Sequence, residues 1–163
     1  MTRDGEIAML REHLDTVARL SDRLTLLRGR LSALIPIDAA RMRALDPDSD
    51  VSVLAFLKTF EQLEDTLGHT LKTIAMLMQL GKVERLTPRD VAQRAAALGV
   101  IDDPRTWADA VRVRNELAHE YPLHPGKQAA QVNAAWDKSG VLFDTQQAII
   151  NFVERERLLH GEL

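Results

Sequence analysis

The sequence of 163 residues has no cysteine, one tyrosine and only 4% aromatic residues. Without cysteine, the chain forms neither disulfides nor thiolate-ligated metal sites. Hydrophobic residues make up 45% of the chain and charged residues 28%, which is typical of a folded globular protein rather than a disordered one. Because aromatic rings are so few, aliphatic side chains must fill the core, and the abundant alanine and leucine favour packed helices.

Long apolar runs are also missing. No uninterrupted apolar segment approaches the length of a signal sequence or of a membrane-spanning helix. We therefore expect a cytoplasmic protein with no membrane partner. The formal net charge of −3 argues against a protein that binds nucleic acid mainly through a large positive surface. Any contact with RNA should be local, and we expect no DNA partner.

The sequence also lacks the common metal-binding and phosphate-binding motifs. None of the five histidines stands in a His-x3-His or His-Glu-x2-His arrangement, and there is no glycine-rich phosphate loop or nucleophile-elbow serine. The sequence therefore predicts no metal site and no cofactor. We interpret the acidic residues Glu61, Glu64, Asp65 and Glu84 as a solvated helix surface rather than as metal ligands.

What the sequence does contain is helical periodicity. Apolar residues recur three, four or seven positions apart, and strand-like alternation is not found. These patterns predict an all-α fold, an antiparallel helical bundle of four to five main helices in a single domain over residues 1–163. Capping residues, prolines and glycines place the helices at residues 5 to about 34, 53–80, 88–98, 104 to about 122 and 127 to about 159.

Two interruptions of the helices are expected. Residues 36–50 contain two prolines and several acidic residues, which indicate a loop with at most two helical turns over 39–45. Ser52 would then cap the helix that follows this loop. The pair Ser139-Gly140 is expected to bend the last helix or to divide it in two.

The residues that suggest chemistry lie between Val111 and Pro122. This stretch places Arg114, Asn115, His119 and Tyr121 in the pattern Arg-x4-His-x-Tyr. On a helix, Asn115 and His119 share one face, whereas Arg114 and His119 diverge by roughly 140° around the axis. One copy of the helix therefore does not aim both side chains at one atom.

These residue types suit RNA cleavage. Histidine gives or takes a proton near neutral pH, and the planar fork of arginine matches phosphate oxygens. A proton-transfer group beside a phosphate clamp suits this reaction, because the 2′-OH must lose a proton while negative charge builds on the phosphorus. No metal is required for this chemistry.

The pattern resembles the signature of the HEPN family of helical nucleotide-binding domains, in particular its HepT-like branch, which carries Arg-x4-His-x-Tyr with Asn usually after the Arg. The likeness extends upstream to Thr87-Pro88-Arg89-Asp90-Val91, to Leu98-Gly99-Val100-Ile101-Asp102-Asp103 and to Trp107. That order is similar to the related nucleotidyltransferase substrate-binding proteins. The resemblance covers residues 53 to about 123. The first fifty residues exceed the compact family core, so they would enlarge a dimer interface or shield the cleft.

The resemblance implies a metal-independent endoribonuclease toxin, acting as a homodimer with the motif residues of both chains in one cleft. His119 would be the general acid or base, Arg114 would stabilise the phosphorane charge, and Asn115 would orient His119 or bind the RNA backbone. The substrate would be an RNA such as a tRNA or an mRNA. The resemblance also implies a minimal nucleotidyltransferase antitoxin that adds AMP to Tyr121, although Tyr121 also suits simple packing at the helix end.

Two other hypotheses stay open. The upstream Thr-Pro-Arg-Asp-Val segment and Trp107 equally suit a non-catalytic module that pairs with a nucleotidyltransferase and helps to hold its substrate. The acidic net charge favours this alternative, whereas the segment 116–121 is more similar to the toxin branch. The other hypothesis is a helical scaffold in which the motif has lost its function.

Overall fold

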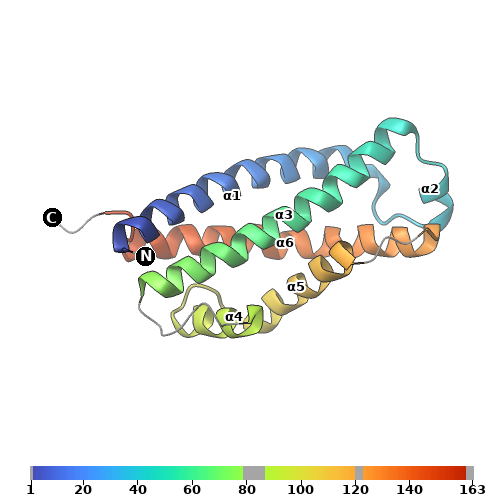
Figure 1. Cartoon of the computed structure of the whole chain (residues 1–163). Coiled ribbons are helices and arrows are strands. Elements are labelled where there is room, and N and C mark those ends of the chain that lie inside the picture. The colour runs from blue at the N-terminus through green and yellow to red at the C-terminus, as the bar shows by residue number, and fades with distance from the viewer. Residues whose placement is uncertain (1, 79–86, 120–122, 161–163) are drawn as a thin grey trace.

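The computed structural model describes residues 2–78, 87–119 and 123–160, and these residues form six α-helices and one short 3-10 turn, with no strand. Three long helices, α1 (Arg3–Leu31), α3 (Pro47–Leu77) and α6 (Pro125–Arg155), lie side by side along the molecule (Figure 1). The prediction of an all-α fold is confirmed. None of the described helices combines the length and the apolar character needed to cross a membrane.

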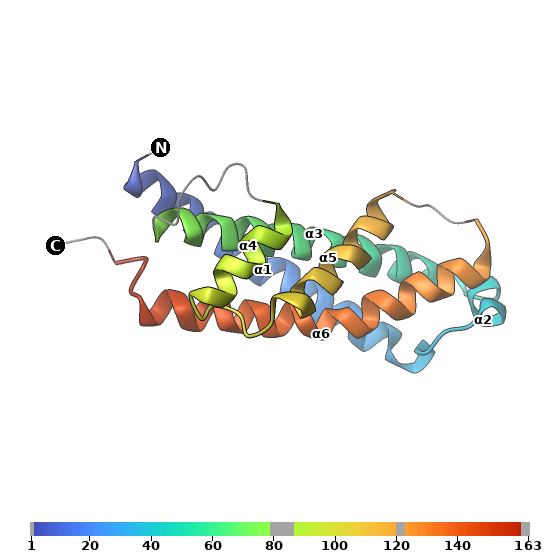
Figure 2. The same cartoon turned by 90° about the horizontal axis from the view of Figure 1, so that it is seen from below.

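The helix α3 lies at the centre of the arrangement. It contacts α1, α6 and the two shorter helices α4 (Pro88–Ala97) and α5 (Pro104–His119). The connection from α1 to α3 holds the 3-10 turn η1 (Ser32–Leu34) and α2 (Ala39–Arg43), and α1 and α3 run in opposite directions (Figure 1). Figure 2 shows α4 and α5 on one side of α3 and α6, with α1 behind.

The core is built mainly from aliphatic side chains of the three long helices. Its fully buried members include Leu10, Leu24 and Leu31 of α1, Phe56, Phe60, Leu63, Leu67 and Leu71 of α3, and Leu142, Ile149 and Phe152 of α6. Those of α3 are three or four residues apart and those of α1 are multiples of seven apart, which are both spacings of an amphipathic helix. The periodicity that predicted these two helices therefore marks the faces that pack.

The start of α3 differs from the prediction. The helix begins at Pro47, six residues before the expected position 53, and Asp46 caps it by accepting a hydrogen bond of 2.7 Å from the backbone N–H of Ser49. Ser52 is inside the helix, so its prediction as the cap is wrong. An acidic cap followed by proline at the first helical position is a standard start signal. The loop over 36–50 is accordingly shorter than expected and holds α2.

The two helices around the motif begin as predicted. Thr87 and Asp90 form a capping box at α4: the Thr87 hydroxyl accepts from the Asp90 N–H at 3.2 Å, and the Asp90 carboxylate accepts from the Thr87 N–H at 3.1 Å. Gly99 follows α4 with a φ of +77°, a conformation that favours glycine. The helix α5 then starts at Pro104.

The last helix is neither divided nor ended at Ser139-Gly140. Instead, α6 continues to Arg155. The buried Ser139 hydroxyl donates to the carbonyl of Trp136 at 2.6 Å and accepts from Nη1 of Arg28 at 2.7 Å. These bonds satisfy the serine without breaking the helix and connect α6 to α1.

Candidate functional site

The predicted motif lies on the second half of α5. This helix faces the core through Trp107, Ala110 and Val113, which are three residues apart. Arg114 follows Val113 at the edge of the buried surface, and 28% of its side chain is exposed. Asn115 comes next and is exposed. Arg114 therefore stands at the boundary between the core and the solvent.

The guanidinium of Arg114 reaches across to α3. Its Nη2 donates to Oδ1 of Asp65 at 2.9 Å, and its Nε lies 3.3 Å from Oε2 of Glu64. On its own helix, Nη1 donates to Oδ1 of Asn115 at 3.2 Å. The structure thus joins Arg114 to its neighbour Asn115 and adds two carboxylates that the motif does not contain.

Glu64 is buried, with an exposed fraction of 5%. Burial raises the pKa of its carboxyl to about 7, against the opposite effect of the Arg114 guanidinium. The Nε of Arg114 is itself buried and has no hydrogen-bond acceptor among the described residues. The two groups therefore attract each other without an aligned hydrogen bond. The interpretation of Glu64 as part of a solvated surface is wrong, although it holds for the exposed Asp65.

A pocket of about 240 Å³ opens beside this cluster, between α3, α4 and α5. Its polar lining consists of Glu64, Asp65, His69, Lys72, Arg114 and Asn115. Trp107 and Val111 form part of its apolar wall. A concave site with apolar walls and a few convergent polar groups is the usual form of a small-ligand site. The guanidinium of Arg114 and the buried carboxyl of Glu64 therefore meet in one pocket.

His119 lies apart from this pocket. It is the last residue of α5 and is exposed. No hydrogen bond or ion pair joins it to Arg114 or Asn115 in the part of the chain that the structure describes. This placement agrees with the divergence of Arg114 and His119 expected from their spacing. Tyr121 lies outside the described residues.

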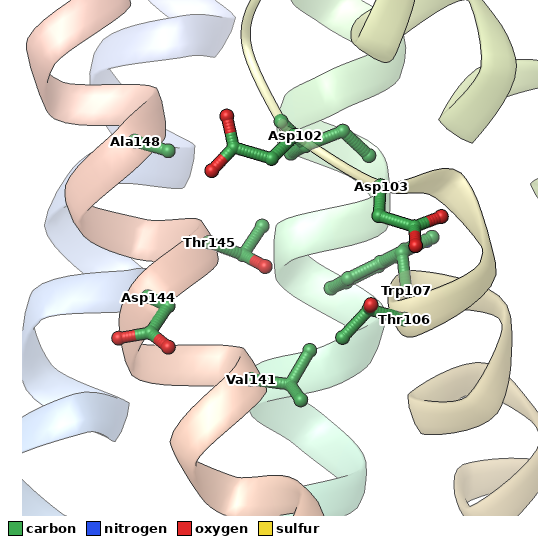
Figure 3. Close-up of a pocket in the computed structure, with 9 residues that line it drawn as sticks. Asp102, Asp103, Thr106, Trp107, Val141, Asp144, Thr145 and Ala148 are labelled. Atoms are coloured by element: carbon green, nitrogen blue, oxygen red, sulfur yellow. The ribbon is translucent and has the colours of Figure 1, made fainter.

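A second pocket, of about 190 Å³, lies between α5 and α6 and is acidic (Figure 3). Asp102, Asp103 and Asp144 contribute to its lining, and no basic side chain does. Asp103 is also held by Arg105, whose Nη2 lies 3.2 Å from its Oδ2. The described residues contain no group of three or more His, Asp or Glu side chains placed to hold a metal ion. An RNA phosphate would be repelled here, so the pocket beside Arg114 is the better candidate site.

A scan against protein-family models finds no family that matches this chain, and searches of curated proteins and of solved structures find no match either.

Proposed function

We propose that this protein is a metal-independent endoribonuclease toxin of the HEPN family, of the HepT-like kind, and that it acts as a homodimer. The observation that supports this proposal most is the placement of Arg114 and His119 on α5. Arg114 lies partly exposed at the rim of a pocket, and His119 is exposed at the end of the same helix. Both groups are accessible to an RNA backbone.

In the proposed reaction, His119 removes the proton from a ribose 2′-OH, and the 2′-oxygen attacks the adjacent phosphorus. Arg114 donates hydrogen bonds to the non-bridging oxygens as charge builds on the phosphorane. The protonated His119 then gives this proton, through a water molecule, to the departing 5′-oxygen. The products are a 2′,3′-cyclic phosphate and a 5′-hydroxyl, so atoms and charges balance without a metal.

A dimer supplies what one chain lacks. Arg114 and His119 point in directions that differ by roughly 140° around α5. Two α5 helices facing each other across a two-fold axis would place Arg114 of one protomer opposite His119 of the partner subunit. In this proposal Asn115 orients the histidine or binds the RNA backbone.

The proposal includes an antitoxin, a minimal nucleotidyltransferase that transfers AMP to Tyr121. An AMP group two residues beyond His119 would add bulk and negative charge where the RNA phosphate must bind. Mass spectrometry of the protein after incubation with that enzyme and ATP tests this step: a mass increase of one AMP on the peptide that holds Tyr121 supports it. An unmodified peptide together with continued inhibition of the toxin contradicts it.

A second candidate function is a non-catalytic module that holds a substrate for a nucleotidyltransferase. The pairing of Arg114 with Glu64 and Asp65 favours this candidate, because it neutralises much of the positive charge that RNA phosphate would need. The net charge of −3 favours it as well.

Cleavage of total RNA and of tRNA in the presence of EDTA tests the first function. We expect the wild type to cleave and both Arg114→Ala and His119→Ala to lose cleavage while keeping their helical circular dichroism. His160→Ala is the matched control, because His160 is exposed and lies outside α5. A folded wild type that cleaves no RNA contradicts the nuclease and shifts the weight to the binding module.

A further inference from the structure

The pocket beside Arg114 is small and mixed in character. Its volume of about 240 Å³ lies below the range of about 300–1,000 Å³ that is usual for drug-sized ligands. Trp107, Val111 and Val91 supply apolar walls, and Glu64 supplies a carboxyl group. These dimensions and walls suit one flat heterocycle rather than a stretch of polynucleotide.

Glu64 is the feature of this pocket that points to a ligand. Glu64 lines the pocket and is buried, with an exposed fraction of 5%. No hydrogen bond within the described residues reaches its carboxyl, because the neighbouring Nε of Arg114 is not aligned to donate. Buried carboxyl groups normally accept hydrogen bonds. The carboxyl of Glu64 is ion-paired with Arg114 but accepts no hydrogen bond from a described residue, so it can accept hydrogen bonds from a ligand bound in the pocket.

We infer that this pocket binds one guanine base of the RNA substrate, with the Glu64 carboxylate accepting hydrogen bonds from the guanine N1–H and N2–H groups. This inference rests on the proposed nuclease function. Guanine alone among the four bases places two N–H donors side by side on its Watson–Crick edge. Adenine, cytosine and uracil each place an acceptor atom next to their donor, and that acceptor would face the second carboxylate oxygen and be repelled.

Arg114 connects the base site to the proposed chemistry. A guanidinium carries five N–H donors, of which the structure commits one on Nη1 to Asn115 and one on Nη2 to Asp65. The second hydrogen on each of these nitrogens stays available for a phosphate. Nε of Arg114 lies 3.3 Å from Oε2 of Glu64, so the base site adjoins the guanidinium that would bind a phosphate of the same RNA.

Gly68 offers a way to fill the pocket without disturbing the protein. A Cβ at this position in α3 would lie 3.9 Å from Cζ2 of Trp107 and 4.0 Å from Oε1 of Glu64, which are ordinary contact distances. Gly68→Ala should therefore fold well, yet its methyl group would occupy space between Trp107 and Glu64. Gly29 in α1 is the matched control, because a Cβ there meets nothing within 4 Å. Both substitutions improve helix propensity by about 1 kcal/mol.

Isothermal titration calorimetry of the protein with the four nucleoside 3′-monophosphates at about pH 8 tests the inference, because the Glu64 carboxyl, whose pKa is raised to about 7, is mainly ionised there. For the wild type we expect guanosine 3′-monophosphate to bind at least about tenfold more tightly than the other three. Glu64→Gln should abolish this preference, because its amide NH₂ would face a guanine donor. Gly68→Ala should weaken guanosine monophosphate binding about tenfold, and Gly29→Ala should bind as the wild type does.

Sequencing of the RNA ends produced by the wild type gives the second readout, with guanine expected at one fixed position beside the cut. Equal binding of all four nucleotides, or a guanine preference that survives in both Glu64→Gln and Gly68→Ala, overturns the inference. The two proposals fail differently. Selective guanosine monophosphate binding without RNA cleavage keeps the base site and rejects the nuclease. Cleavage of RNA without any guanine preference keeps the nuclease and rejects the base site.

Discussion

The Nη2 atom of Arg114 in α5 lies 2.9 Å from Oδ1 of Asp65 in α3, a residue 49 positions earlier in the chain. This hydrogen bond connects the helix that carries the motif to the central helix of the bundle. Together with the ion pair to Glu64, it fixes the direction of the guanidinium, so the arginine is oriented before any ligand arrives.

Replacing Arg114 by lysine tests whether the orientation of the cation matters as well as its charge. Lysine keeps the charge, but its single ammonium does not reproduce the fork that serves Asp65, Asn115 and a phosphate together. We expect Arg114→Lys to lower kcat/KM for RNA cleavage by about 100-fold with little change in the thermal midpoint. A lysine variant as active as the wild type would show that charge alone is sufficient.

The raised pKa of Glu64 predicts a pH-dependent stability. The folded state retains a proton on this carboxyl up to a pKa of about 7, whereas the unfolded state releases it near the ordinary value of 4.5. Between these values the native state binds more protons than the unfolded state. The contribution of Glu64 to the free energy of unfolding therefore falls as pH rises from 4.5 and is lost above about pH 7. The total decrease is up to about 3 kcal/mol.

Urea unfolding of the wild type and of Glu64→Gln at about pH 5 and about pH 8 measures this effect. Glutamine does not titrate, so we expect the free energy of unfolding of the wild type to fall relative to that of Glu64→Gln between about pH 5 and about pH 8. The comparison also cancels the pH dependence of the other titrating groups, including His13. Parallel pH profiles for the two proteins would contradict the prediction.

The stacked histidines His13 and His69 provide a third prediction. Their rings lie 6.1 Å apart between centroids and are inclined by 19°. Burial and then the nearby His69 lower the pKa of His13 below 6.5, and Glu12 raises it. We expect His69→Gln to raise the pKa of His13 while leaving it below 6.5, because burial remains. NMR titration of the imidazole signals measures this value, and an unchanged or lower pKa would contradict the assignment.

Mixing two inactive variants tests the composite site of the proposed dimer. If each site pairs Arg114 of one chain with His119 of the other, a dimer of one Arg114→Ala chain and one His119→Ala chain keeps one intact site. Random pairing makes half of the dimers mixed, so co-refolding should restore about a quarter of the wild-type activity. Co-refolding Arg114→Ala with the double variant is the control and should restore nothing. No rescue in the first mixture would contradict a site shared in this way.

The sequence predicts where a helix begins when a capping residue and a proline are not followed by residues that also favour a loop. Thr87-Pro88 and Asp103-Pro104 mark α4 and α5 correctly. Asp46-Pro47 is the same kind of signal, but the acidic and serine residues after it suggest a loop, so the start of α3 was placed too late. At Ser139-Gly140 the last helix is not divided, and Ser139 contacts Arg28 and the Trp136 carbonyl there.

The site was predictable only in part. The spacing of Arg114, Asn115 and His119 on one helix follows from local sequence. Glu64 required tertiary information, because its partner Arg114 is fifty positions away and nothing local links them. One signal was present, since Glu64 falls four residues after Phe60 and three before Leu67, within the apolar row of α3. An acidic residue in such a row must find a partner or hold a proton.

The packing of α1 along α3 has a consequence for where the protein can be divided. The segment that resembles the HEPN core, residues 53–123, leaves Leu10, Leu24 and the rest of the buried face of α1 behind, together with α6. Expressed alone, it would turn the central helix into an exposed apolar surface prone to aggregation. Proteolytic cuts or fusion junctions should therefore spare both flanking helices, and the smallest piece that folds is close to the whole chain.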